Sequence, residues 1–433
     1  MATPHKPTPA MSVSSWRSYV ALLRDNPQFR RFWLAQIISQ FGNWFNYIGV
    51  FVLLQKLTGS GQAVSWFLIA KFLPSSVFGP AAGVFADRFS RKTIMISSDL
   101  LRAVVVLSFL LVRKPEHVWL VYVLALAQET LWTFANPARQ ASVPNLVNAE
   151  QLNIANALSG ATWSTLLAFG AALGGLVTAM AGWQTAIIID SLTFLTSALL
   201  VVRVVIPAHQ KKSPDSGSEK NTKWLDYIGY YDLREGVRYV LGHRKVMALL
   251  LVKSGWALSG GILVMLVVFG EQVFATSASG SGSGLLYSCR GIGAAIGPIL
   301  AWHLLGEESP AMMRGIALSF FVSCFAYIMF SQASNIWLAI PFVLLGHIGG
   351  ATQWVFSTTL LQRIVEDQYR GRVFAAEMAI VTLILSLSTY WTGVALDQGH
   401  NPRNVALGLA LLFLLPGTFW QVYLFWRRRS KVS

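Results

Sequence analysis

Residues 83–92 read GVFADRFSRK, and this short stretch places Asp87, Arg88, Arg91 and Lys92 between two long apolar runs. The chain of 433 residues is 54% hydrophobic and 12% charged. Soluble globular proteins carry about 25% charged residues. Apolar runs of roughly 20 residues suit helices that cross a bilayer, and they recur on both sides of the cluster. The sequence therefore predicts an all-α integral membrane protein with this stretch on a turn between two spans.

The apolar runs are separated by short segments rich in Gly, Pro, Asn and Ser, which are the residues that let a chain reverse. Their number predicts twelve transmembrane helices. We expect these near residues 29–56, 62–86, 93–112, 117–138, 151–179, 184–205, 246–270, 283–305, 313–331, 335–362, 371–396 and 404–426.

The positive charges fall mainly on one side of this predicted topology. Of 34 Lys and Arg residues, 25 lie in segments on the side that holds both termini, while the opposite side holds Lys56, Arg113, Lys114 and Arg403. Because cytoplasmic loops are enriched in Lys and Arg, both termini are expected in the cytoplasm. The formal net charge of +15 is then an orientation signal of a protein in the cytoplasmic, or inner, membrane, and no nucleic-acid partner is expected.

A polar linker divides the chain into two halves. We expect a cytoplasmic segment over 1–28, a six-helix bundle over 29–205, a linker with a surface amphipathic helix over 206–243, a second bundle over 244–427 and a basic tail over 428–433. An offset of 218 residues superposes Gly79 on Gly297 and Gly175 on Gly393. This duplication predicts two pseudo-symmetric bundles with a site between them near the membrane midplane.

Four motifs together resemble the major facilitator superfamily. GVFADRFSRK resembles its pattern Gly-x-x-x-Asp-Arg-x-Gly-Arg-Arg/Lys, with Ser90 in place of the second glycine. ANPARQASVPNLV, LREGVRYVLGHR and EDQYRGRV resemble a narrower branch that includes enterobactin exporters and macrolide efflux proteins. The resemblance implies the major facilitator fold, in which two six-helix bundles rock around a central cavity, and it implies solute export driven by proton uptake.

The resemblance also implies a cytoplasmic gate at the quoted stretch. Asp87 would face the N-terminus of the eleventh span, where the helix dipole favours a carboxylate. Arg91 would orient Asp87, and Glu377 would accept one of the cations. The candidate gate residues are Gly83, Asp87, Arg88, Arg91, Lys92 and Glu377.

Ionisable residues inside the spans are the candidates for proton coupling, because burying them in hydrocarbon is costly and their default role is functional. Glu129 lies about 18 Å into the fourth span at 1.5 Å per residue, close to the midplane. His347 occupies the equivalent level of the tenth span, where an imidazole can exchange protons or can serve as a structural hydrogen-bonding group.

The candidates for a substrate cavity are buried cations and polar or aromatic side chains. Lys71 and Arg290 would favour an anionic or catechol-like substrate or pair with Glu129, or they would extend to the headgroups. The other polar and aromatic candidates would line the cavity or hold helices together. The candidates are Asn43, Asn46, Lys71, Gln128, Trp132, Lys253, Arg290, Gln353 and Trp354, whereas Asp190 is read as a packing residue.

Other chemistry has no support in the sequence. No phosphate-binding loop, nucleophile elbow or metal-spaced His/Cys cluster occurs, and Cys289 and Cys324 lie in apolar segments. We therefore expect no enzyme activity, cofactor or metal. The expected function is a monomeric proton-coupled exporter of a siderophore, a macrolide or another amphipathic small molecule. An importer or lipid translocator, and a membrane sensor or scaffold that transports nothing, are the alternatives.

Overall fold

The computed structural model describes residues 16–206, 234, 238–274, 279–306 and 308–429. Within these ranges the chain is helical and contains no strand. The first half holds α1 Trp16–Asp25, α2 Pro27–Thr58, α3 Gly61–Arg88, α4 Arg91–Ser108, η1 Phe109–Leu111, η2 Pro115–His117, α5 Val118–Leu146 and α6 Ala149–Val202. The second half holds α9 Arg244–Ala257, α10 Ile262–Val268, η3 Phe269–Val273, α11 Ser281–Leu305, α12 Ser309–Gln332, α13 Ile336–Ile364, α14 Asp367–Asp397, α15 Pro402–Leu412 and α16 Leu414–Arg429.

Ten helices in the described part of the chain are long and apolar enough to cross a membrane, so the protein is multi-pass. Two of the expected spans, 151–179 and 184–205, lie within the range of α6, whose helical backbone is interrupted at Gly182 with φ of 82°, so they are separate helical segments on either side of this residue. A third expected span, 62–86, lies in α3. The all-α membrane fold is confirmed, and the count of twelve spans stays a prediction.

Helix starts follow local sequence rules. The side chains of Asn26, Ser60 and Ser90 accept hydrogen bonds from backbone N–H groups three residues later, which satisfies donors that a helix leaves free at its N-terminus. Ser90 therefore caps α4 at the position where the family pattern has glycine. Pro27 and Pro402 stand at the first helical position, where a missing N–H has no cost.

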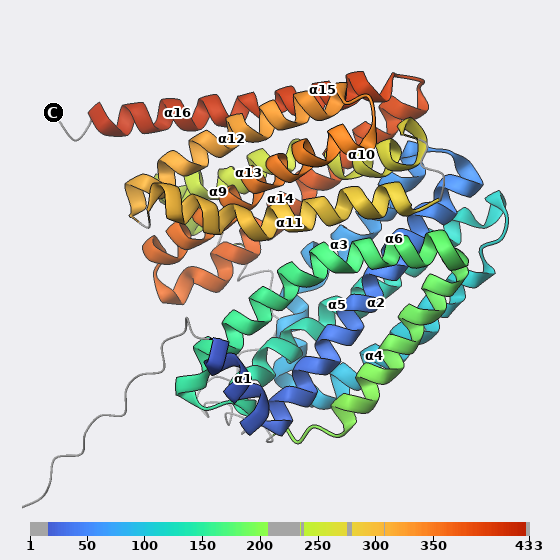
Figure 1. Cartoon of the computed structure of the whole chain (residues 1–433). Helices are drawn as coiled ribbons and strands as arrows, with labels where there is room; N and C mark the ends of the chain where they lie inside the picture. Colours follow the sequence, from blue (N-terminus) through green and yellow to red (C-terminus); the bar gives the residue numbers. More distant parts are fainter. Residues whose placement is uncertain (1–15, 207–233, 235–237, 275–278, 307, 430–433) are drawn as a thin grey trace, which may run out of the picture.

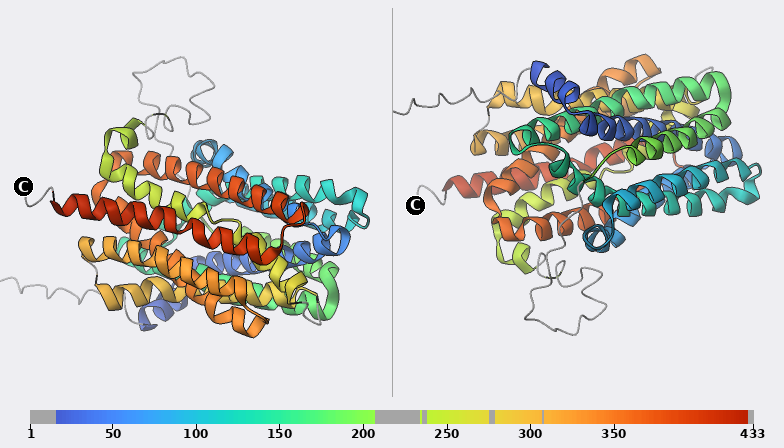
Figure 2. Two further views of the ribbon diagram at one scale, coloured as in Figure 1. Left: turned by 90° about the horizontal axis from the view of Figure 1, so that it is seen from above. Right: turned by 90° about the horizontal axis from the view of Figure 1, so that it is seen from below.

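The helices form two bundles that lie side by side (Figure 1). In the first half, α2 packs on α6 and α3 on α5, while in the second half α13 packs on both α11 and α12. The halves meet where α3 contacts α14 and α6 contacts α11. The N-terminal helix α1 and the end of α16 lie at the same end of the bundles, which we call the termini side (Figures 1 and 2). The opposite end is the far side.

Contacts between the halves concentrate toward the far side. Backbones come close at glycines: a Cβ on Gly175 would lie 2.8 Å from the carbonyl oxygen of Gly280, and one on Gly393 would touch the Ser65 side chain. Aromatic rings also meet across the seam, with the centroids of Trp66 and Tyr390 5.4 Å apart. The ribbons of the two halves diverge toward the termini side (Figure 1).

Several predicted segments lie partly outside the described residues. The amphipathic helix predicted within 206–243 falls mostly on residues 207–233 and 235–237, and the tail over 428–433 is described only to Arg429. In the predicted segment 1–28 the description begins with α1. The five domain boundaries stay predictions.

Candidate functional site

A pair of opposite charges lies in the middle of the first half. The ammonium of Lys71 on α3 is 3.3 Å from a carboxylate oxygen of Glu129 on α5, and it donates to the amide oxygen of Gln128 at 3.3 Å. The Glu129 side chain keeps 17% of its surface exposed and that of Lys71 keeps 8%. The structure therefore brings together three of the residues predicted from the sequence, and it leaves part of the Glu129 side chain exposed.

A chain of hydrogen bonds continues from this pair into the first bundle. The amide of Gln128 donates to the side-chain oxygen of Asn43 on α2 at 3.4 Å. The same oxygen accepts from Arg102 on α4 at 2.8 Å. One polar network thus connects α2, α3, α4 and α5.

Sequence reasoning missed the next part of this network, which is centred on Asp99. Its carboxylate lies 3.9 Å from Arg102 and 3.8 Å from Arg139, and it accepts from the Ser197 hydroxyl on α6 at 2.7 Å. A signal was present, because Asp99 and Arg102 stand three residues apart and share one face of a helix. Its meaning depended on Arg139 and Ser197, which are distant in the sequence.

Asp190 is wholly buried in α6, and one of its carboxylate oxygens has no hydrogen-bond partner among the described groups. Among the described residues of the first half, the cations Lys71, Arg102 and Arg139 are buried together with Asp99 and Asp190, and Lys71 pairs with the partly exposed Glu129. Buried charges are tolerated when they are compensated in this way.

Trp132 lies close to two of these cations. The guanidinium groups of Arg102 and Arg139 are 5.3 Å and 5.9 Å from its ring centroid. This placement turns Trp132 toward the charged interior of the first bundle. Its role in a substrate cavity stays a prediction.

The second half contains its own ion pair. The ammonium of Lys253 on α9 lies 2.7 Å from a carboxylate oxygen of Glu377 on α14, with 3% and 1% of the side chains exposed. The Trp354 ring lies 4.8 Å from the same ammonium. Glu377 was expected beside the gate cations, but in this conformation it pairs with Lys253 within its own bundle.

His347 and Arg290 occupy separate positions. The Nδ1 atom of His347 lies 2.7 Å from the hydroxyl of Tyr327 and 3.2 Å from the carbonyl oxygen of Val343. The guanidinium of Arg290 lies 5.6 Å from the ring centroid of Tyr287. Among the described contacts it is Lys71, not Arg290, that pairs with Glu129.

Two other predicted cavity residues are buried without partners. The side-chain amides of Asn46 and Gln353 are fully covered, and neither atom of either amide has a hydrogen-bond partner among the described groups. Buried amides usually have partners, so these two mark positions that water or a ligand can satisfy.

The predicted gate stretch forms the turn between α3 and α4. Arg91 donates to the carbonyl oxygen of Ala141 at 2.7 Å, and Lys92 donates to that of Val202 at 2.7 Å. These bonds hold two cations near the ends of α5 and α6, where carbonyl oxygens carry partial negative charge. Arg88 is exposed and Gly83 has open space around it. The Asp87 side chain lies outside the described residues, so the gate stays a prediction.

No group of three or more His, Cys, Asp or Glu that could hold a metal ion occurs in the described part of the chain. The two cysteines there, Cys289 and Cys324, are buried and unpaired.

Comparison with known proteins agrees with this architecture. A family model described as Major Facilitator Superfamily matches residues 32–389. Macrolide efflux protein A of Streptococcus pyogenes is 27% identical over 405 residues, covering 90% of this chain and 93% of that protein. The enterobactin exporter EntS of Salmonella typhi is 25% identical over 433 residues, covering 94% and 96%.

Among solved structures, the fold resembles that of a bacterial homolog of the human lysosomal transporter Spinster in an inward-facing and unoccupied conformation. The TM-score is 0.68 at 13% identity, over 95% of this chain and 98% of that one. At this identity the likeness concerns the fold alone.

Proposed function

This chain belongs to the Major Facilitator Superfamily, and from that premise we propose that it is a proton-coupled exporter of amphipathic small molecules working by alternating access. The protein would lie in the cytoplasmic membrane with its termini side facing the cytoplasm. The concentration of Lys and Arg on that side supports the orientation.

One observation carries the coupling proposal, namely the contact between Lys71 and Glu129. A carboxylate 3.3 Å from an ammonium attracts it strongly when both are largely shielded from water. Proton uptake by Glu129 removes the negative charge and leaves Lys71 with its hydrogen bond to Gln128 and its contact with the Tyr47 ring. The pair joins α3 to α5, and α3 also packs on α14 of the other half, so a change in this pair reaches the interface between the halves.

The conformation also fits a transport cycle. The halves contact each other toward the far side, and their ribbons diverge toward the termini side (Figure 1), which supports assigning this conformation to the cytoplasm-open state of the proposed cycle. Substrate would enter from there, and the opposite conformation would release it outside. A conformational equilibrium shifts only by the differential affinity of the ligand for the two states, and the charge of Glu129 would supply that difference for protons.

The direction and substrate class are drawn from the relatives. Two of them are named for macrolide efflux and enterobactin export, which supports export of amphipathic compounds. Lys71 and Arg290 supply cations beside the aromatic rings of Tyr47 and Tyr287, whose centroids are 6.3 Å apart at the contact between the halves.

Transport in proteoliposomes tests the proposal. A panel of siderophores and macrolides would be assayed for counterflow and for pH-gradient-driven flux with the unmodified protein, Glu129→Gln and Glu116→Gln. We expect Glu129→Gln to keep counterflow and lose stimulation by the gradient, because a neutral side chain cannot exchange a proton. Glu116, which is exposed on η2, provides the matched control.

Equal stimulation by the gradient in Glu129→Gln and in the unmodified protein would refute coupling through this residue. Flux only toward the cytoplasm would favour an importer, and transport of phospholipid alone would favour a lipid translocator. Binding without flux of any compound would favour a sensor or scaffold.

A further inference from the structure

Two equivalent helices begin on the far side and are capped in different ways. Helix α3 begins at Gly61 and α11 at Ser281, and the Gly79 and Gly297 landmarks place them at corresponding positions in the two halves. The first N–H groups of a helix lack partners within the helix and must find acceptors elsewhere. The source of those acceptors differs between α3 and α11.

At α3 the acceptor comes from the opposite half. Asp397, the last residue of α14, accepts a short hydrogen bond from the Ser60 hydroxyl and a second one from the backbone N–H of Gln62 at 3.3 Å. Ser60 itself is the N-cap of α3 and accepts from the N–H of Ala63 at 3.0 Å. The carboxylate therefore stands at the positive end of the α3 dipole, where negative charge is favoured.

At α11 the acceptor comes from the same half. Glu271 on η3 accepts from the backbone N–H groups of Gly280 at 2.9 Å and Ser283 at 3.2 Å, and from the Ser283 hydroxyl at 2.7 Å. This cap can move with its helix as a unit. Separating the halves on the far side thus removes the carboxylate from α3 and leaves that of α11 in place.

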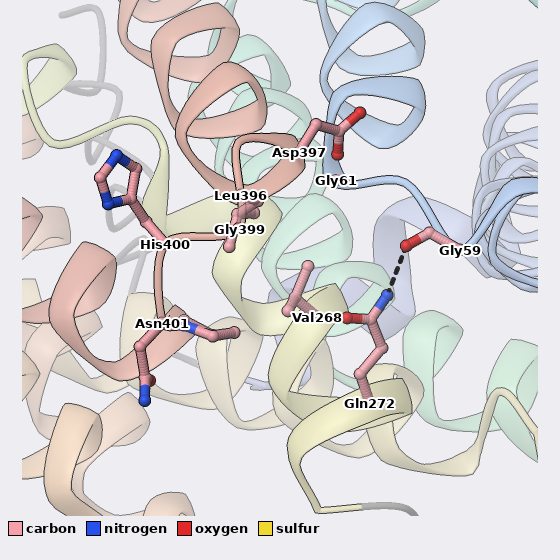
Figure 3. Close-up of a pocket in the computed structure, with 10 residues that line it drawn as sticks. Gly59, Gly61, Val268, Gln272, Leu396, Asp397, Gly399, His400 and Asn401 are labelled. Atoms are coloured by element: carbon pink, nitrogen blue, oxygen red, sulfur yellow. Dashed lines mark hydrogen bonds between the residues drawn. The ribbon is translucent and has the colours of Figure 1, made fainter.

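A second contact from the opposite half reaches the turn between α2 and α3. The amide of Gln272 on η3 donates to the side-chain oxygen of Gln55 and to the carbonyl oxygen of Gly59 at 3.0 Å. Figure 3 shows the bond between Gln272 and Gly59 beside a pocket of about 400 Å³. Residues of both halves line this pocket, among them Gly59, Gln272, Asp397 and His400. The pocket gives solvent access to Asp397, so its carboxylate can be hydrated when the halves part.

We infer that Asp397 is a positioning residue that, with Ser60 and Gln62, forms a far-side latch holding the outer end of the transport pathway closed. The inference rests on the proposed alternating-access function. In this cycle the latch would be made in the cytoplasm-open state and broken in the outward-open state. Loss of the carboxylate would then shift the equilibrium toward the outward-open state.

Thiol labelling without substrate or gradient tests the latch independently of transport. The reporter is Ser288→Cys in a background with Cys289→Ser and Cys324→Ser, because Ser288 is buried in the separate seam between α6 and α11, where its hydroxyl donates to the carbonyl oxygen of Ala168. An impermeant maleimide added outside cells reaches this position only when the far side opens.

We expect Asp397→Ala to raise the labelling rate about fivefold, the population change for loss of one helix-capping group at an exposed site. Glu271→Ala also removes a carboxylate that caps a helix, but Glu271 and that helix belong to the same half. The variant should therefore change the labelling rate less than about twofold, because no bond between the halves is lost. Ser60→Ala should raise the rate, and adding it to Asp397→Ala should produce no further rise, because the bond that Ser60 makes to the other half ends at Asp397.

An unchanged rate in Asp397→Ala, or an equal rise in Glu271→Ala, would overturn the latch. Additive effects of Ser60→Ala and Asp397→Ala would do the same. Asp397→Leu keeps a side chain of similar size without a hydrogen-bond acceptor, so it provides the same test if the alanine variant fails to fold. A labelling shift in Asp397→Ala, together with transport that shows no proton coupling, would leave the latch standing while the proposed coupling fails.

Discussion

The ion pair between Lys253 and Glu377 allows a prediction on stability. The two side chains are 3% and 1% exposed, their charged atoms are 2.7 Å apart, and the second oxygen of Glu377 has no hydrogen-bond partner among the described groups. Methionine in place of Lys253 has an unbranched apolar side chain of similar length but no positive charge. The buried carboxylate of Glu377 is then left without a compensating cation. Breaking a buried pair from one side costs about 3–5 kcal/mol in soluble proteins.

In a bilayer the lower end of that range is the better guide, because a partly unfolded membrane protein also finds partners for its polar groups. A loss of about 3 kcal/mol corresponds to roughly 6–12 °C in the midpoint of thermal unfolding for a unit the size of one six-helix half. The double variant Lys253→Met with Glu377→Leu removes both charges, and we expect it to be close to the unmodified protein or more stable.

The assay is thermal unfolding of the purified protein in detergent, followed by the loss of monodisperse protein after heating. Arg24→Met provides the control, since Arg24 pairs with Asp25 at 2.7 Å on the exposed surface of α1, where such a pair adds little. Equal losses in the single and double variants would refute the reasoning, because they would show that the charge left behind carries no cost. A single variant as stable as the unmodified protein would also refute it.

Two further predictions follow from the packing and the buried network. Gly175→Ala places a Cβ 2.8 Å from the carbonyl oxygen of Gly280, so the halves must separate there. We therefore expect faster far-side labelling of the thiol reporter at residue 288. Gly408→Ala should not change the labelling rate, because a Cβ at Gly408 meets open space. Asp99→Asn leaves two buried arginines without their carboxylate and should lower the unfolding midpoint by several degrees, about 2–3 kcal/mol, with a smaller loss for Ser197→Ala.

The positions of the helices could be predicted from the sequence because hydropathy and turn residues act locally. The run at 335–362 was predicted nearly as it is found in α13, and the AGW turn coincides with the break at Gly182. The two spans predicted there are found as two helical segments on either side of Gly182, and they are joined at this one residue with positive φ. Glycine adopts that conformation without steric cost, so the chain changes direction there without a longer loop.

The pairing of charges could be predicted only in part. Lys71 was one of two candidate partners for Glu129, because depth in the membrane selected both cations, and only the structure shows which of them reaches the carboxylate. Lys253 and Glu377 are 124 residues apart, and their contact depends on how α9 packs against α14. Hydropathy places a residue at a depth, but it does not specify the direction in which its side chain points.

The duplication adds a constraint on which carboxylate exchanges protons. The position equivalent to Glu129 is His347, which contacts Tyr327 and Val343 and forms no ion pair among the described residues, while the ion pair of the second half lies on different helices. The two halves therefore share a fold but not a charge arrangement. Glu129 keeps 17% of its side chain exposed, whereas the Glu377 side chain keeps 1%. A carboxylate must contact water or another carrier to exchange a proton, so in this conformation exchange is expected at Glu129, and the pair in the second half is expected to hold α9 against α14.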